Sequence, residues 1–259
     1  MLEQTLSDLE VIIADDGSTD GTDLLVASFN DTRTRYLRLE HTGHIGQVRN
    51  AGAKIATGKW IAFLDSDDSW LPQKLGLQIQ ALTASGKKWS YCGFCHVDEF
   101  GKTMPAKAGQ FRPVDGWITR KLLTHEVAAI VCSLMVDRSI FNIAGGFSCD
   151  PRLALRGDYE FVLRLSQIAE AVAVRATLVR VLEHKGRITH SIEDPFARSM
   201  VPYLVFLETQ RDPGMRNIAR QQINRLIKEQ HRSKNARRTP LFRAFEHFRN
   251  FAFSSTRLP

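Results

Sequence analysis

Two short apolar segments, each ending in a cluster of aspartates, constrain the fold of this 259-residue chain more than any other feature. The first is LEVIIAD (Leu9–Asp15), which continues into DGSTDGT, and the second is WIAFL (Trp60–Leu64), which continues into DSDD. Continuous runs of branched apolar residues predict strands that are buried on both faces. Helical patterns accompany them at Thr22–Phe29, Gly46–Thr57 and from Pro72 to about Ser85. This alternation predicts a mainly parallel, doubly wound sheet over the first 95 residues.

The second aspartate cluster is the strongest candidate site in the sequence. Asp65, Asp67 and Asp68 lie within four residues of one another, at the carboxyl end of a predicted strand. Ligands of doubly wound sheets bind beyond such strand ends. Three carboxylates so close together repel one another unless they share a cation, and Mg²⁺ and Mn²⁺ prefer carboxylate and phosphate oxygens. The alternative is a solvated acidic turn that caps the helix after it.

The first cluster offers a second candidate. Asp16 follows a predicted buried strand and precedes a tight turn at Gly17 and Ser18. A carboxylate in this place can accept a hydrogen bond from a nucleobase or a ribose. The alternative is a helix-capping turn, for which Thr19 and Asp20 would suffice.

The net charge of +7 is concentrated in the last part of the chain. Residues 211–259 hold 12 lysines or arginines against 3 acidic residues, whereas the rest of the chain holds 23 against 25. This basic tail either lies on an anionic membrane surface or is simply solvated while its phenylalanines pack on the protein. No nucleic-acid recognition module accompanies the charge, so we expect no nucleic-acid partner. We find no apolar run long enough for a membrane span and no secretory signal, and expect a cytoplasmic protein, free or peripheral at the inner face of the membrane.

Three motifs, in order and spacing, are similar to those of the family 2 glycosyltransferases of GT-A fold. They are DLEVIIADDGSTDGT, GQVRNAGAKIATGKWIAFLDSDDSWLPQKL and GGFSCDPRLALRGDYEFVLRL, and the resemblance covers roughly Gln4 to Thr189. It implies a metal-dependent hexosyltransferase that moves a sugar, with inversion, from a nucleotide-sugar donor to a hydroxyl acceptor. A UDP-sugar donor, a saccharide or lipid-linked acceptor, an Mn²⁺ or Mg²⁺ cofactor and a role in surface polysaccharide or glycolipid synthesis are what this resemblance favours.

The resemblance also assigns roles to individual residues. They are Asp16, Arg49 and Asp65 for the donor, Asp67, Asp65 and His184 for the metal, and Asp158 for the catalytic base. Local readings compete with two of them: Asp158 could be a helix cap beside Gly157, and His184 an ordinary histidine at a strand end.

The expected architecture is a GT-A-like domain with a doubly wound mixed sheet at 1–190 and a helical basic extension at 191–259. The later elements expected are a helix at Gly116–Thr124, a strand at Ile130–Val136, a helix at Asp158–Ile168, strands in Ala171–Leu182, and helices near Phe196–Thr209, Asn217–Gln230 and Leu241–Phe251.

The chain departs from the family pattern in two places. Members usually have Glu-Asp where this chain has Gly157-Asp158. The family also begins with an apolar strand, roughly 20 residues before the position of Met1, which lies in the sheet between the two strands that end in aspartates. We expect that strand to be missing and Met1 not to be the natural start. Two other functions remain open: a truncated, non-catalytic nucleotide-binding remnant, and a Mg²⁺-dependent nucleotidyltransferase, which would have no need of the base at Asp158.

Overall fold

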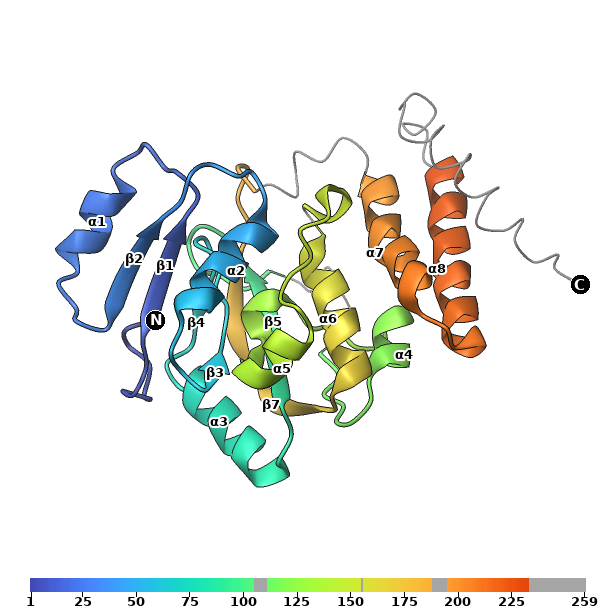
Figure 1. Ribbon diagram of the computed structural model, residues 1–259, viewed down its shortest axis with the longest axis horizontal. Coiled ribbons are helices and arrows are strands. Elements are labelled where there is room, and N and C mark those ends of the chain that lie inside the picture. The colour runs from blue at the N-terminus through green and yellow to red at the C-terminus, as the bar shows by residue number, and fades with distance from the viewer. Residues whose placement is uncertain (105–110, 155, 188–194, 233–259) are drawn as a thin grey trace, which may run out of the picture.

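The strands of the protein form two separate sheets (Figure 1), in a computed structural model that describes residues 1–104, 111–154, 156–187 and 195–232. The smaller sheet pairs β1 (Val11–Asp15) with β2 (Thr34–Arg38) in parallel. The larger sheet has the order β3-β6-β5-β7-β4. Its strands are β3 (Trp60–Ile61), β4 (Ser69–Trp70), β5 (Trp89–Val97), β6 (Met135–Asp137) and β7 (Ala171–Leu182).

The larger sheet is mixed, as the expected fold class requires. Only β5 and β7 pair in parallel, while β3 with β6, β5 with β6 and β4 with β7 are antiparallel. Within the first 95 residues β1 and β2 pair in parallel as expected, whereas β3 and β5 do not pair with each other, because β6, which lies well beyond the first 95 residues, inserts between them and is antiparallel to both. The segment expected as one strand, Ile130–Val136, divides into a 3₁₀ turn, η1 (Val131–Ser133), and β6.

Eight α-helices lie within the described residues. They are α1 (Thr22–Ser28), α2 (Ile45–Ile55), α3 (Lys74–Ser85), α4 (Thr119–Leu123), α5 (Arg138–Ile143), α6 (Gly157–Ile168), α7 (Pro195–Thr209) and α8 (Pro213–Arg232). A further 3₁₀ turn, η2 (Pro151–Leu153), precedes α6. The helix expected at Leu241–Phe251 lies outside the described residues. In the part of the chain that is described, no helix combines the length and the apolar character that a membrane crossing requires.

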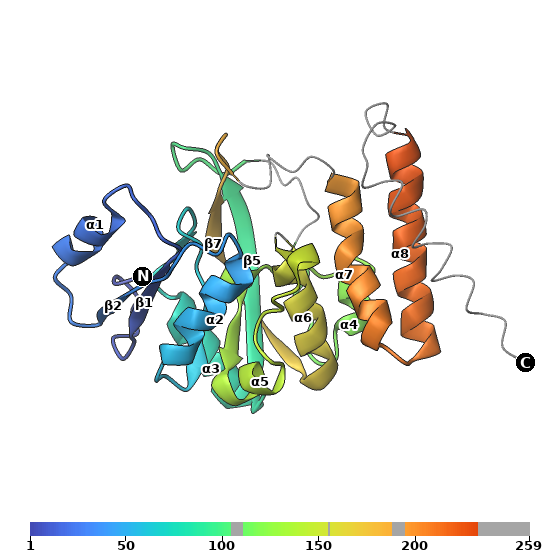
Figure 2. The same ribbon diagram turned by 45° about the horizontal axis from the view of Figure 1, so that its top comes forward.

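One hydrophobic core runs from the larger sheet into the C-terminal helices. Trp89 and Tyr91 of β5 and Phe161 of α6 are fully buried in it. Met200 and Tyr203 of α7 belong to the same buried cluster. Figure 2 shows α7 beside α6, with α8 on its outer side. The first two helices of the expected extension therefore pack on the sheet-bearing part of the molecule.

The smaller sheet lies at the end of the molecule opposite to α7 and α8 (Figure 1). Helix α1 buries none of its residues, and Leu24 and Leu25 are exposed. Strands β1 and β3, between which we expected an absent strand, are in different sheets, and no pairing joins them among the described residues. The Glu10 carboxylate links the two parts, because its Oε1 accepts hydrogen bonds from the backbone N–H groups of Thr57, at 2.6 Å, and Gly58, at 2.9 Å.

Candidate active site

The two aspartates at the end of β1 have different surroundings. Asp15 is buried, and its Oδ1 accepts a hydrogen bond from the Ser18 backbone at 3.0 Å, while its Oδ2 accepts one from the Tyr36 hydroxyl. Hydrogen bonds from the hydroxyls of Ser18 and Tyr36 lower the pKa of Asp15. Gly17 has a φ of 81°, a left-handed conformation that turns the chain sharply after Asp16. Asp15 therefore builds the turn, and Asp16 lies nearer the surface.

The carboxylate of Asp16 is held by the loop that precedes α2. It accepts hydrogen bonds from the backbone of Thr42 at 2.7 Å, the Thr42 hydroxyl at 2.9 Å and the backbone of Gly43 at 2.9 Å. Burial by itself would raise the pKa of Asp16, but the hydrogen bonds from Thr42 and Gly43 outweigh it and lower the pKa. The carboxylate that follows β1 is thus an anion fixed by the loop between β2 and α2.

Arg49 and Asp65 form an ion pair. Arg49 lies on α2, and its Nη2 is 2.5 Å from Oδ1 of Asp65. Its guanidinium also lies over the ring of Phe147, with Cζ 5.3 Å from the ring centroid. The Arg49 side chain is only 15% exposed, whereas that of Asp65 is 39% exposed. Arg49 therefore fixes one carboxylate oxygen of Asp65 while the carboxylate stays accessible to a ligand.

Asp67 and His184 are brought together from positions 117 residues apart in the chain. His184 follows β7, and its Nε2 is 3.1 Å from Oδ2 of Asp67. Both side chains are about one third exposed, at 36% for His184 and 31% for Asp67. A carboxylate and an imidazole that meet at the surface can bind a divalent cation together.

Asp68 has a structural role at the base of the same turn. Its Oδ1 accepts a hydrogen bond from the backbone of Leu182 at 3.2 Å, which attaches the turn to the end of β7. Burial raises the pKa of Asp68, and the charges of Asp67 and Asp65 act in the same direction. Among the described residues, Asp65, Asp68 and Cys132 form the one group of three potential ligands whose atoms lie within 4.8 Å of one another.

The thiol of Cys132 lies directly under the acidic turn. The backbone N–H of Asp65 is 3.4 Å from its Sγ. Burial raises the pKa of the thiol, and the charges of Asp65 and Asp68 add to this, so it stays protonated at neutral pH. A neutral thiol is a poor ligand for a hard cation.

Three polar side chains hold the backbone of η1 beneath this thiol. Trp70 Nε1 donates to the carbonyl of Cys132 at 2.8 Å, Gln78 Nε2 donates to that of Ser133 at 2.9 Å, and Lys74 Nζ is 3.4 Å from that of Leu134. The three carbonyl groups are consecutive in the chain, so the three side chains hold the end of η1 and the residue after it. Sequence reasoning missed this cluster, although the spacing of four residues from Trp70 to Lys74 and from Lys74 to Gln78 was a usable signal.

Lys74 is fully buried. Its Nζ donates to Gln78 Oε1 at 2.7 Å and lies 4.0 Å from the centroid of the Trp70 ring. Burial lowers the pKa of Lys74 to about 8. Among the described residues, no acidic side chain hydrogen-bonds to Lys74, so the ammonium group is held by neutral acceptors and an aromatic face.

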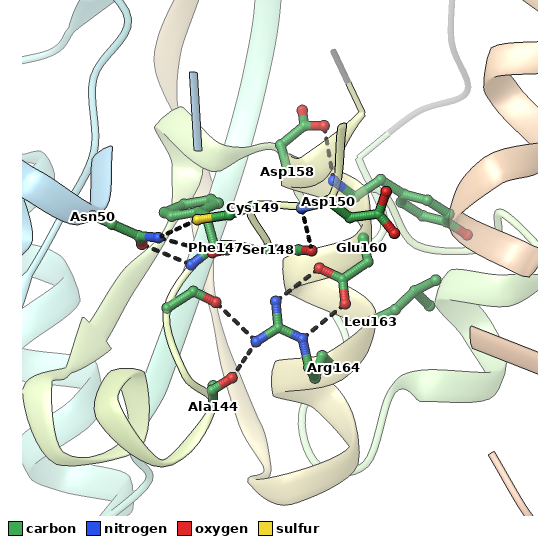
Figure 3. Close-up of polar contacts among 12 residues, drawn as sticks. Asn50, Ala144, Phe147, Ser148, Cys149, Asp150, Asp158, Glu160, Leu163 and Arg164 are labelled. Atoms are coloured by element: carbon green, nitrogen blue, oxygen red, sulfur yellow. Dashed lines mark hydrogen bonds and ion pairs between the residues drawn. The ribbon is translucent and has the colours of Figure 1, made fainter. Parts of the chain in front are cut away.

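Asp158 lies in the first turn of α6. Its Oδ1 accepts a hydrogen bond from the backbone of Tyr159 at 2.8 Å. Figure 3 shows its carboxylate outside the network that surrounds Arg164 further along the helix. Within the described residues, neither Asp16 nor Asp158 makes a hydrogen bond or ion pair with Arg49, Asp65, Asp67 or His184.

Side chains of α2 and α6 hold the GGF turn between them (Figure 3). The Asn50 amide pairs with the backbone of Phe147 in both directions, each time at 2.8 Å. Arg164 donates to the carbonyl of Gly146 at 2.8 Å and forms two hydrogen bonds of 2.7 Å with the buried carboxylate of Glu160. The motifs around Asn50, Gly146 and Arg164 therefore form one unit beside the Arg49–Asp65 pair. Sequence reasoning named the motifs but not these contacts.

The glycosyl transferase family 2 model matches residues 1–141, which is more than half of the chain, and the protein therefore belongs to this family. The chain is 37% identical over 143 residues to the UDP-Glc:alpha-D-GlcNAc-diphosphoundecaprenol beta-1,3-glucosyltransferase WfgD of Escherichia coli, a match that covers 55% of this chain and 54% of WfgD. It is 44% identical over 78 residues to the succinoglycan biosynthesis protein ExoO of Rhizobium meliloti, covering 30% of this chain and 22% of ExoO. The match thus spans about half of WfgD and less of ExoO.

A solved structure shares the fold. It is that of S. aureus TarS 1-349 in complex with UDP-GlcNAc, with a TM-score of 0.68 and 17% sequence identity, and the match covers 86% of this chain and 65% of that one. The GT-A-like fold expected from the sequence is confirmed by this likeness. At this level of identity the likeness concerns the fold alone.

Proposed function

We propose that the protein is an inverting glycosyltransferase that moves a hexose from a UDP-sugar to a hydroxyl acceptor, with Mn²⁺ or Mg²⁺ as cofactor. The observation that carries the proposal is the convergence of two pairs. Arg49 meets Asp65, and Asp67 meets His184, although the members of the second pair are 117 positions apart. The family membership and the UDP-glucose donor in the name of WfgD support the choice of donor.

The metal would be held by Asp67, Asp65 and His184. When bound, it would supply positive charge that stabilises the diphosphate leaving group. The fit rests on the donor set, which consists of two partly exposed carboxylates and one partly exposed imidazole. Arg49 engages Oδ1 of Asp65 and leaves its Oδ2 for another partner.

The remaining residues bind the donor and move the proton. Asp16, fixed by Thr42 and Gly43, would accept a hydrogen bond from the nucleobase. The guanidinium of Arg49 would add positive charge near the nucleotide. The carboxylate of Asp158 would take the proton from the acceptor hydroxyl as the new C–O bond forms, and inversion needs only this one base.

The acceptor would be a saccharide or a lipid-linked saccharide, with the protein at the inner face of the membrane. The name of WfgD includes a diphosphoundecaprenol-linked acceptor. Charge supports the location, since the basic tail at 211–259 carries 12 lysines or arginines against 3 acidic residues. Such an excess favours anionic lipid surfaces.

Replacement of the base tests the proposal. Asp158→Asn keeps the shape of the side chain and its hydrogen bond to Tyr159 but cannot accept a proton at neutral pH. We expect donor affinity, measured by calorimetry with UDP-glucose and Mn²⁺, to change little while UDP release falls by a factor of about 10³, since general-base catalysis contributes 10²–10⁴. Asp98→Asn is the matched control, because Asp98 also accepts backbone hydrogen bonds, from Phe100 and Lys102.

The same assay separates the rival functions. A non-catalytic remnant would bind UDP-glucose without releasing UDP at any concentration of Mn²⁺. A nucleotidyltransferase would instead release pyrophosphate from a nucleoside triphosphate and a sugar phosphate. Loss of donor affinity in Asp158→Asn would make Asp158 a binding or structural residue and refute its assignment as the base.

A further inference from the structure

Helix α7 contacts the start of α6 on both sides of Asp158. Arg156 Nη2 donates to the hydroxyl of Ser199 at 3.2 Å, and the hydroxyl of Tyr159 lies 3.3 Å from that of Tyr203. Ser199 and Tyr203 are four residues apart, and therefore lie on one face of α7. Figures 1 and 2 both show α7 alongside α6. Two residues one helical turn apart on α7 thus contact residues that precede and follow Asp158 in the chain.

The tyrosine contact belongs to a buried chain of hydrogen bonds. The hydroxyl of Tyr203 is 2.7 Å from Nε2 of His125, and that of Tyr159 donates to the carbonyl of Leu122 at 2.9 Å. The single proton of the Tyr159 hydroxyl is shared between the hydroxyl of Tyr203 and the carbonyl of Leu122, and that carbonyl also accepts a hydrogen bond from the backbone N–H of His125 at 3.0 Å. Burial lowers the pKa of His125 and keeps the ring neutral.

Backbone conformation shows that this cluster is tightly determined. His125 has a φ of 59°, a left-handed conformation that is uncommon for a residue with a side chain. Its ring stacks on that of Tyr159, with centroids 5.9 Å apart and planes at 14°. Strained residues persist only where the surroundings hold them in place. The ring of Tyr159 is therefore fixed from one side by His125 and at its hydroxyl by Tyr203.

A third contact joins α7 to η2, the turn that precedes α6. Arg152 donates to both carboxylate oxygens of Glu208, at 2.7 and 3.1 Å, and also binds Asp150. The segment that carries Asp158 is thus held by α7 at positions 152, 156 and 159.

We infer that α7 positions Asp158, and that Ser199 and Tyr203 are positioning residues for the transfer reaction. The inference rests on the proposed function, in which Asp158 is the base. Among the described residues, the Asp158 carboxylate accepts a hydrogen bond from the backbone of its neighbour Tyr159 alone, so its place is set by the first turn of α6. Misplacement of a catalytic group by about 1 Å can reduce the rate by a factor of about 10². Residues beyond 190 would therefore belong to the catalytic unit.

Removal of two hydroxyls in the full chain tests the inference. The double variant Ser199→Ala, Tyr203→Phe keeps the packing of α7 and loses its hydrogen bonds to α6. We expect kcat to fall by about tenfold or more while KM for UDP-glucose stays within about twofold. Tyr91→Phe is the matched control, because Tyr91 is also buried and its hydroxyl donates to the carbonyl of Val114 at 2.8 Å. A kcat equal to that of the control, at a similar melting temperature, would overturn the inference.

A mutant cycle with Asp158→Asn separates positioning from general damage. With no base left to misplace, the two hydroxyl deletions should cause no further loss of the residual rate. A full additional tenfold loss in that background would assign the hydroxyls to folding alone. The cycle also distinguishes the two proposals: if Asp158→Asn keeps its rate, the proposed function fails, whereas an inactive Asp158→Asn with a fully active double variant refutes only the role of α7.

Discussion

Lys74, which is fully buried, should make the free energy of unfolding depend on pH between about 8 and 10.5. The ordinary pKa of lysine is 10.5, and burial lowers that of Lys74 to about 8. Between these values the unfolded chain binds one proton more than the folded chain. The free energy of unfolding should therefore rise with pH, by about 1.4 kcal/mol per pH unit, and by about 3 kcal/mol over the window. Below pH 8 the full penalty for burying the charge is present.

Urea denaturation of the wild type and of Lys74→Met between pH 7.5 and 10.5 measures this effect. Lys74→Met keeps most of the side-chain volume and removes the titrating group. The hydrogen bonds to Gln78 and Leu134 are lost at every pH, so the informative quantity is the slope of the difference with pH. Cys92, whose pKa burial raises to about 11, titrates with the opposite sign and is present in both proteins.

A flat difference between the two proteins across this range would refute the reasoning. It would mean that Lys74 keeps its ordinary pKa, because its neutral acceptors and the Trp70 ring, 4.0 Å from Nζ, compensate for burial. A difference that falls with rising pH would require a folded pKa of Lys74 above 10.5, which its neutral hydrogen-bond partners Gln78 and Leu134 argue against.

Three further predictions concern the metal, the GGF turn and the tail. Asp67→Ala should reduce transfer by a factor of about 10² or more with little change in melting temperature, and full activity of the wild type in EDTA would remove the metal from the mechanism. Gly146→Ala should lower the free energy of unfolding by about 3 kcal/mol, because its φ is 67° and a Cβ would lie 2.5 Å from Asn50 Oδ1. Gly86→Ala, with a φ of 66° and nothing within 4 Å, should lose only about 1 kcal/mol, and equal losses in urea denaturation would contradict the role of Asn50. If residues 211–259 bind anionic lipid, flotation with phosphatidylserine vesicles should weaken steeply between 50 and 500 mM salt, at concentrations where the Debye length falls below about 10 Å, and salt-independent flotation would contradict an electrostatic attachment.

Elements with strong local patterns were predictable from the sequence. The apolar period of α6 and the long run of β7 appear where we expected them, at Gly157–Ile168 and Ala171–Leu182. Apolar side chains recur at the helix or strand period over about a dozen residues of each element. Such a pattern can be recognised without knowing which segment the element packs against. The acidic clusters after β1 and β3 were readable for the same reason, since each follows an apolar run directly.

Pairings between distant segments were not predictable in this way. The insertion of β6 between β3 and β5 involves three residues, which is too short for a periodic signal. The motifs marked Asp16 and Asp65 as candidates. The tertiary structure showed that Asp15 is the buried member of its pair and that Arg49 binds Asp65. Those outcomes depend on which segments lie opposite each aspartate.

What the sequence determined by itself is the family, the order of its motifs and the acidic residues at the strand ends, because these are carried by neighbouring positions in the chain. The tertiary structure alone decided the contacts that join those motifs. Helix α7 contacts the start of α6 through Ser199 and Tyr203, and Lys74 is held by the neutral acceptors Gln78 and Leu134. The physical reason is that the burial, the partners and the pKa of a side chain are set by residues that folding brings close to it. Many of those residues are far away in the sequence, so the sequence alone does not identify them.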